Sequence, residues 1–394
     1  MLAIATWVIA SSSQQVQQLT NPMAVPRTGH AATALSDGRV LITGGSDSAG
    51  NLVAVSEIYD PATKTSTASA TLTTPRVNHT ATLLADGKVL VAGGTGASGA
   101  LSSAEIFDPA SGGFQAVGSM TTARTGHTAT LLNDGTVLIA GGEATGTAEI
   151  FNPATQTFTA TVGNLTVARS GHTATLFTDD SVLLAGGNTA SMEMYSPLDQ
   201  HFTADAATMS FVRTGHWAFE LSDTRLLLFQ GDTGNTIDEY NPSADTITPK
   251  GSLDFHASSS SLLVNGKVLV LSSGVAGLYD PDAVPPASDF TAFDETSVPG
   301  SSSLQRSGQS ATQLSGDKKI FVAGGTDAQN LFQGVALFNP ARIWTDKDDY
   351  VPGDNVILSG SGWKPSENVY LYAVDDTTDA GTYAVTAEAF VSNA

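Results

Sequence analysis

The sequence predicts an all-β protein, a seven-bladed β-propeller of four-stranded antiparallel blades followed by a partial β-sandwich-like segment. Three observations support this prediction. A block with an arginine, a histidine and a double glycine recurs along the chain at intervals of 42 to 51 residues. Each block contains four strand-like pieces separated by turns, and no long stretch has the 3.6-residue apolar period of a helix.

The third block, which begins at Arg124, shows how we expect one blade to form. "HTATLL" is the first strand, and "NDG" is a tight turn in which Asn, Asp and Gly tolerate positive φ. "TVLIAGG" is the second strand, apolar throughout as a strand covered on both faces should be. Its glycines end the strand where the backbone turns closely. "TAEIFNP" and "TQTFTATV" supply the third and fourth strands.

The blocks can be counted from their arginines and double glycines. The arginines are Arg27, Arg76, Arg124, Arg169, Arg213 and Arg306, and a degenerate sixth copy begins near Phe255. Double glycines or their substitutes follow each copy in step. This regularity gives seven blocks of four strands, which is the number and kind of element that a seven-bladed propeller needs.

The order Arg-x-Gly-His, apolar strand, Gly-Gly, Glu-[Ile/Met]-[Tyr/Phe]-[Asp/Asn]-Pro resembles the kelch repeat over residues 14–343. The resemblance implies a propeller related in fold to the central domain of galactose oxidase. No Trp-Asp dipeptide occurs, which argues against the WD40 type.

The two ends of the chain receive separate predictions. Val16 lies where the fourth strand of a seventh blade is needed, so we expect the N-terminus to close the ring; "ARIWTD", after the last block, is the rival. Residues 1–13 resemble the remnant of a secretory signal, which favours an extracellular or cell-surface protein. Residues 344–394 resemble the first half of an immunoglobulin-like surface module.

Composition excludes several classes of partner. Against 38 acidic residues stand only 17 Lys and Arg, a formal charge of −21, so nucleic-acid binding is disfavoured. No segment beyond the short N-terminal run suggests membrane insertion. The chain has no cysteine, which excludes disulfides and thiol chemistry.

An internal alignment of the blocks assigns five histidines and five glutamates to equivalent positions. They are His30, His79, His127, His172 and His216, with Glu57, Glu105, Glu149, Glu193 and Glu239. Both positions are lost together in blocks six and seven. A catalytic group is needed once rather than five times around a ring, so we expect structural pairs in which histidine and glutamate interact directly or through one neighbour.

The repeated arginines allow two interpretations. They can tie each blade to the next through their fork of donors, or they can form a cationic ring at one mouth of the channel that binds a carboxylate ligand. The positions concerned are Arg27, Arg76, Arg124, Arg169, Arg213 and Arg306.

The function favoured by the sequence is a non-catalytic, secreted or cell-surface propeller that binds a protein or carbohydrate on a loop face, as a monomer. No catalytic, cofactor-binding or metal-binding residue is assigned, and no cofactor is expected. The alternative is a carbohydrate enzyme resembling galactose oxidase or sialic-acid epimerases. The galactose oxidase family uses copper and a tyrosine crosslinked to cysteine, and this chain has no cysteine to form that crosslink. An acidic stretch, "DKDDYVPGD", lacks the specific pattern of a calcium loop.

Overall fold

The computed structural model describes residues 3–5, 15–18, 23–263, 266–283, 289–293, 304–314, 319–326, 335–339, 342–345, 358–361 and 373–375. Regular structure in these residues consists of β-strands, as the sequence predicts. No helix in this part of the chain is long and apolar enough to cross a membrane.

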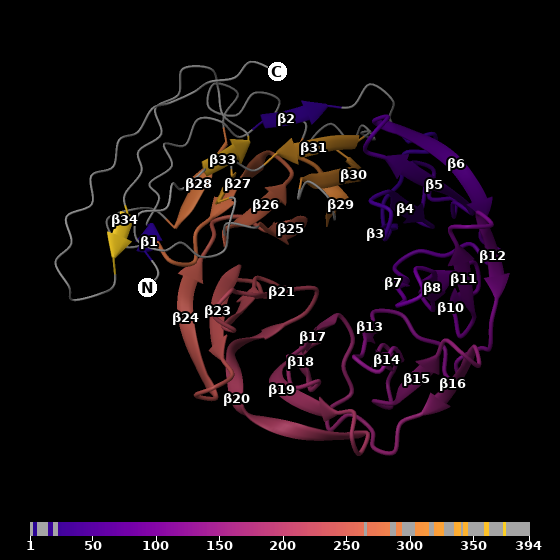
Figure 1. Cartoon of the computed structure of the whole chain (residues 1–394). Coiled ribbons are helices and arrows are strands. Elements are labelled where there is room, and N and C mark those ends of the chain that lie inside the picture. Colours follow the sequence, from indigo (N-terminus) through magenta and orange to yellow (C-terminus); the bar gives the residue numbers. More distant parts are fainter. Residues whose placement is uncertain are drawn as a thin grey trace.

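Seven four-stranded antiparallel sheets form the blades of a ring (Figure 1). Blades 1 to 3 are β3 (Ala31–Ala34), β4 (Val40–Thr43), β5 (Val55–Asp60) and β6 (Thr65–Thr71); β7 (Thr80–Leu83), β8 (Val89–Ala92), β11 (Ala104–Asp108) and β12 (Gly113–Ala116); and β13 (Thr128–Leu131), β14 (Val137–Ala140), β15 (Ala148–Asn152) and β16 (Thr157–Ala160). Blade 2 also carries the small hairpin of β9 (Thr95–Gly96) and β10 (Gly99–Ala100).

The remaining blades repeat this pattern. Blades 4 to 6 are β17 (His172–Leu176), β18 (Val182–Gly186), β19 (Thr189–Ser196) and β20 (His201–Arg213); β21 (Trp217–Glu220), β22 (Leu226–Phe229), β23 (Thr236–Asn241) and β24 (Thr246–Ser252); and β25 (Ser259–Leu262), β26 (Val268–Ser272), β27 (Val275–Tyr279) and β28 (Phe290–Ala292). Blade 7 is β29 (Ser307–Gln313), β30 (Ile320–Thr326), β31 (Val335–Asn339) and β2 (Gln15–Gln18).

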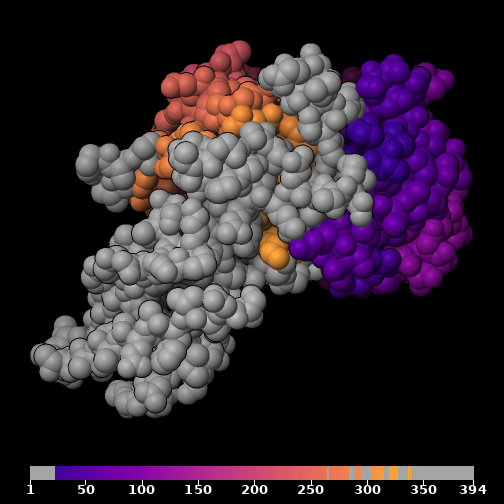
Figure 2. Space-filling view, turned by 90° about the horizontal axis from the view of Figure 1, so that it is seen from above, coloured from indigo at the N-terminus to yellow at the C-terminus, as the bar shows by residue number. Residues whose placement is uncertain are grey.

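The N-terminal strand closes the ring. β2 pairs antiparallel with β31, with Val16 opposite Phe338 and Gln18 opposite Ala336. The rival segment forms β32 (Arg342–Thr345) and pairs with β33 (Leu358–Ser361) instead. Seen from the side of blade 7, blade 1 (indigo) lies on one flank and blade 6 (orange) on the other (Figure 2). Closure by the N-terminus is therefore confirmed, and it covers the edge of β31 that would otherwise be open.

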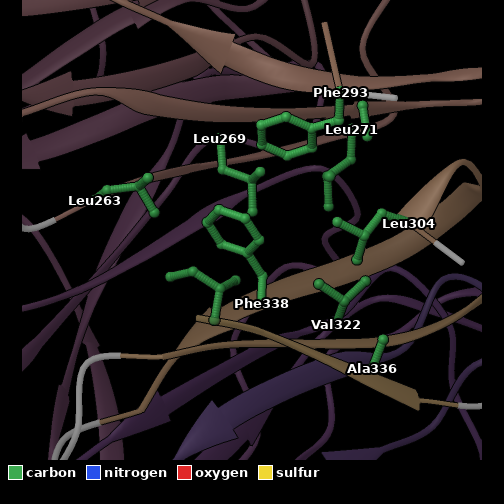
Figure 3. Packing of buried hydrophobic residues seen from close by; sticks show 10 residues of the cluster. Leu263, Leu269, Leu271, Phe293, Leu304, Val322, Ala336 and Phe338 are labelled. Atoms are coloured by element: carbon green, nitrogen blue, oxygen red, sulfur yellow. The ribbon is translucent and has the colours of Figure 1, made fainter. Parts of the chain in front are cut away.

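The hydrophobic core lies between the blades. The second strand of each blade is buried, apart from Thr326 at the end of β30, and seven apolar clusters each join two neighbouring blades. At the junction of blades 6 and 7, for example, Leu269 and Phe293 pack against Val322 and Phe338 (Figure 3). Because each cluster needs two blades, no blade can bury its apolar face alone.

Few residues of the C-terminal segment are described. Besides β32 and β33, they form β34 (Ala373–Asp375), which pairs with β1 (Ala3–Ala5). These short pairs do not show an immunoglobulin-like module. Three segments lie mostly or wholly outside the described residues: the acidic stretch after Thr345, the insertion between blades 6 and 7, and the loop after Thr326.

Candidate functional site: the polar belt between blades and the loop face

All six repeat arginines are buried, with relative exposures of 0 to 2%. Blade 3 shows the arrangement. Arg124 Nη1 donates to the carbonyl oxygens of Gly141, at 2.9 Å, and Thr147, at 2.8 Å, while Nη2 reaches Glu149 Oε1 at 3.0 Å. The guanidinium therefore joins the segment that enters the blade to its second and third strands.

The same ion pair occurs in five blades. Its members are Arg27 with Glu57, Arg76 with Glu105, Arg124 with Glu149, Arg169 with Glu193, and Arg213 with Asp238. The carboxylate also accepts backbone N–H groups of the connecting segment: Glu105 Oε2 accepts from Thr73, and Oε1, which pairs with Arg76, accepts from Thr74 as well. Burial lowers the pKa of Arg76, and the charge of Glu105 opposes that shift. Each pair thus clamps the connection between two blades without facing solvent.

The histidines make contacts in the other direction, toward the preceding blade. Each Nε2 lies 2.8 to 3.0 Å from a hydroxyl: His30 with Ser310, His79 with Thr43, His127 with Thr80, His172 with Thr128, and His216 with Thr173. Burial, and next the charge of the nearby repeat arginine, lowers the pKa of His30 and His127 to about 4. Burial likewise lowers the pKa of His79, His172 and His216 to about 3. These rings are neutral links across five junctions.

The predicted histidine–glutamate pairs do not form as direct contacts among the described residues. The glutamates pair with the arginines of their own blade, and the histidines bond to hydroxyls of the blade before. Glu239 is also misplaced, because Asp238 occupies the acidic position and pairs with Arg213 at 2.8 Å. Glu239 instead pairs with Arg225 and Lys250. Side chains of a strand alternate between its faces, so an error of one residue exchanges the inner and the outer acid.

The double glycines accommodate the next blade. A Cβ on Gly44 would lie 2.3 Å from the carbonyl oxygen of Arg76 and 2.6 Å from Cε1 of His79, and Gly44 has a φ of +60°. The N–H of Gly45 donates to the same Arg76 carbonyl at 2.9 Å. The glycines therefore end the strand because of close approach, as the sequence predicts, and the approaching group is the arginine and histidine of the following blade.

The junction of blades 5 and 6 replaces this belt with other contacts. Phe255 stands where the arginine is expected, and its ring packs on Phe290 with centroids 5.1 Å apart. Gln230 replaces the first glycine, and its side chain donates to Phe255 O at 3.0 Å and accepts from Ala257 N at 2.6 Å. On the outside, Arg225 bonds to Asp282 of blade 6 at 2.9 Å. Apolar packing and a bridging amide thus substitute for the buried charges.

The interpretation of the arginines as a ligand-binding ring is not supported, because their side chains are enclosed by protein. Their contacts agree with the other interpretation, in which the arginines tie the blades together. In blade 7 the acidic position holds Ala336, and burial lowers the pKa of Arg306 to about 10. Arg306 Nη1 still donates to Gly324 O at 2.9 Å, so this arginine keeps the architectural contact of its sisters.

A loop face remains as the candidate interaction surface. Because the strands alternate in direction, the loops between second and third strands lie at the same end as the connections between blades. Bridges between Thr28 and Ser46 and between Leu101 and Arg124 confirm this placement. The loops of blades 1 and 2 are long and fold over these connections, whereas blades 4 and 5 leave apolar side chains exposed: Val167 (41%), Phe211 (50%) and Val212 (58%).

The described residues do not form a copper centre of the galactose oxidase kind. The chain has no cysteine for the tyrosine crosslink. Among the described residues no group of three or more His, Asp or Glu side chains is placed to hold a metal ion. The five buried histidines are distributed one to a blade and each contacts a hydroxyl, so they do not converge on one atom.

Comparisons with known proteins agree with this architecture. A family model described as the KLHDC2/KLHL20/DRC7 Kelch-repeats domain matches residues 4–195. No curated protein matches the sequence. Among solved structures, a fungal alcohol oxidase of the AA5 family, in complex with copper, is similar with a TM-score of 0.64 and 15% identity, over 82% of this chain and 76% of its own. At that identity the similarity shows the fold alone.

The repeats, the closed ring of four-stranded blades and these similarities define a β-propeller. More particularly, the chain is a kelch-repeat propeller, related in fold to the galactose oxidase-like proteins.

Proposed function

We propose that this protein is a non-catalytic, secreted or cell-surface kelch propeller that binds a protein or carbohydrate ligand through its loop face. The observation that carries the proposal is the use of the repeat arginines, histidines and acids in contacts between strands and blades. None of these groups is left for chemistry in the channel mouth. Repeat folds usually bind through the variable loops of one face. On that face this chain has both its long loops and the exposed apolar side chains of Val167, Phe211 and Val212.

Extracellular placement rests on the apolar N-terminal run. A fusion of residues 1–13 to a periplasm-dependent reporter enzyme tests it. The reporter should become active when the run is intact and lose activity when charged residues interrupt the run. If the fusion with the intact run is also inactive, export by this segment is contradicted.

The interaction face is tested by binding to the extracellular fraction of the source cells and to a glycan array. A double variant, Phe211→Ser with Val212→Ser, should lose the bound ligand. The matched control is Leu198→Ser, because Leu198 is 97% exposed and lies in the turn between β19 and β20 at the other end of blade 4. Equal loss in both variants would contradict a specific loop face.

The alternative function, a carbohydrate oxidase, makes opposite predictions. The purified chain is incubated with Cu²⁺, dialysed and assayed for metal content and for oxidation of galactose and primary alcohols. We expect neither stoichiometric copper nor hydrogen peroxide production. Tightly held copper together with turnover would overturn the binding function.

A further inference from the structure

Blades 3 and 4 carry acidic turns that lack the basic residue found at the same place in other blades. The turn after the first strand holds an aspartate followed two residues later by Arg39 in blade 1, Lys88 in blade 2 and Arg225 in blade 5. Each of these cations pairs with the turn aspartate, at 2.6 to 3.1 Å. In blades 3 and 4 the same position holds Thr136 and Ser181. Their hydroxyls donate to the aspartates but leave the negative charge in place.

The result is a surface with negative charge and no cation beside it. We call it the acidic flank, and it consists of Asp134, Asp179, Asp180 and Asp199. Asp180 Oδ1 accepts the N–H of Asn133 at 3.2 Å, which joins the turns of blades 3 and 4. Among the described residues no Lys or Arg pairs with the acidic flank, and Asp199 has only His201, at 4.0 Å. Between residues 89 and 224 the basic residues are the buried belt arginines Arg124, Arg169 and Arg213.

Large apolar side chains are exposed on the same two blades. Leu198 is 97% exposed in the turn that carries Asp199, whereas the equivalent residue of blades 1 to 3 is alanine. Val162 of blade 3 is 71% exposed. The N–H of Gly163 donates to Gln200 O at 3.0 Å, so Val162 lies beside the turn of Leu198. Exposed apolar side chains next to charged groups are typical of protein interaction sites.

A buried hydroxyl beneath the acidic flank supports this interpretation. Tyr195 is fully buried, and its Oη has no hydrogen-bond partner among the described residues. Phe107 and Phe151 fill the same position in blades 2 and 3, so packing does not require the hydroxyl. Burial raises the pKa of Tyr195 to about 12, and the charges of three carboxylates of the acidic flank add to the shift, which places the hydroxyl close to them. A polar group in this state is normally completed by water or by a bound ligand.

We propose that the acidic flank, with Leu198 and Val162, is a docking surface for a basic amphipathic segment of a partner protein. Lysine or arginine side chains of such a segment lie among the carboxylates, and its apolar side chains cover Leu198 and Val162. The cations then supply the charge that Arg39 and Lys88 supply in blades 1 and 2. The formal charge of −21 attracts basic partners to the whole chain, whereas the carboxylates without a neighbouring cation favour this surface.

This inference goes beyond the proposed function, because the turns of the acidic flank lie at the end of the ring opposite the loop face and share no residue with it. The two proposals use the same variants with opposite expected results. Leu198→Ser should lose the basic segment and keep the loop-face ligand, and Phe211→Ser with Val212→Ser should do the reverse. Failure of either surface therefore leaves the other standing.

The experiment uses the full chain and a fluorescent peptide in which lysine alternates with leucine, with binding followed by fluorescence anisotropy. The salt concentration is about 0.15 M, because a Debye length of about 8 Å then screens charges on distant blades. Thr136→Lys with Ser181→Arg installs the cations of the sister turns and should weaken binding at least tenfold. The matched control, Ala62→Lys with Ala110→Lys, adds the same charge at exposed turn positions of blades 1 and 2 and should weaken binding less than twofold.

Three results would overturn the proposal. One is that the wild type binds the lysine–leucine peptide no more tightly than a peptide in which glutamate alternates with leucine. Another is that the variant pair and its control weaken binding equally while thermal unfolding shows that both are folded. The last is that Leu198→Ser binds as the wild type does and spermidine displaces the peptide at equal concentration, because the surface would then take a free polyamine rather than a protein segment.

Discussion

Acid should unfold this propeller through its five junction histidines. Their folded pKa values lie near 3 to 4, below the ordinary value of 6.5, because each ring is buried beside an arginine. In four rings, those of His79, His127, His172 and His216, the buried Nδ1 has no hydrogen-bond partner among the described residues. Protonation would therefore place an N–H donor where no acceptor stands.

The direction in which stability changes with pH follows from proton binding in the folded and unfolded states. The unfolded chain binds a proton on each histidine below pH 6.5, and the folded chain does so only near pH 3 to 4. Stability is therefore complete above pH 6.5 and falls as the pH decreases toward the folded pKa values. At pH 5 each ring removes about 2 kcal/mol, or on the order of 10 kcal/mol for all five. That loss is comparable with the whole stability of a typical domain, about 5 to 15 kcal/mol.

The assay is urea unfolding followed by tryptophan fluorescence at several values between pH 7 and pH 5. Carboxylates with ordinary or lowered pKa values titrate mostly below this window, so the histidines dominate it. His127→Gln, which copies Gln309 of blade 7, should reduce the pH dependence by about one fifth. His201→Gln is the control, because the side chain of His201 is 53% exposed.

An unchanged urea midpoint between pH 7 and pH 5 would refute the reasoning. So would equal effects of His127→Gln and His201→Gln on the pH dependence. A midpoint that falls with pH in the wild type, and falls less in His127→Gln alone, is the result that the buried rings require.

Further predictions concern the other parts of the belt. Glu105→Ala leaves Arg76 as a buried charge without its carboxylate and should lower the free energy of unfolding by about 3 to 5 kcal/mol in urea titrations, and the double variant with Arg76→Ala should lower it by less than the sum of the two single changes. Gly93→Ala places a Cβ 2.6 Å from Cε1 of His127 at a φ of +59°, so it should lower the thermal midpoint strongly, whereas Gly113→Ala should change stability by no more than about 0.5 kcal/mol. Removal of residues 1–18 takes away β2 and uncovers β31, so light scattering should show aggregation that the full chain lacks.

The sequence was sufficient for the architecture because the repeat supplies its own alignment. Seven copies of one pattern give the number of blades, and Val16 stands at the distance from Arg27 that Phe158 keeps from Arg169. The acidic register failed in blade 5, where Asp238 and Glu239 are adjacent and only the spacing from Tyr240 separates them. In the other four blades the inner acid precedes the third-strand aromatic by two residues, as Asp238 precedes Tyr240.

The partner of the histidines could have been found from the sequence as well. In blades 2, 3 and 4 the residue after the histidine is a threonine, and its hydroxyl contacts the histidine of the next blade. In blade 5 that residue is Trp217, and blade 6 has Ser258 in place of the histidine. The hydroxyl and the histidine are lost together across one junction, which is the signal of a contact. The simultaneous loss of the acid in blades 6 and 7 obscured it.

The junction of blades 5 and 6 forms without the polar residues that recur at the other junctions. There the chain closes a junction with Phe255, Phe290 and Gln230, so the buried arginine, acid and histidine are one solution to joining blades rather than a condition of the fold. A residue that recurs in five blades therefore indicates a contact that joins blades, even when its side chain is of a kind that often takes part in catalysis.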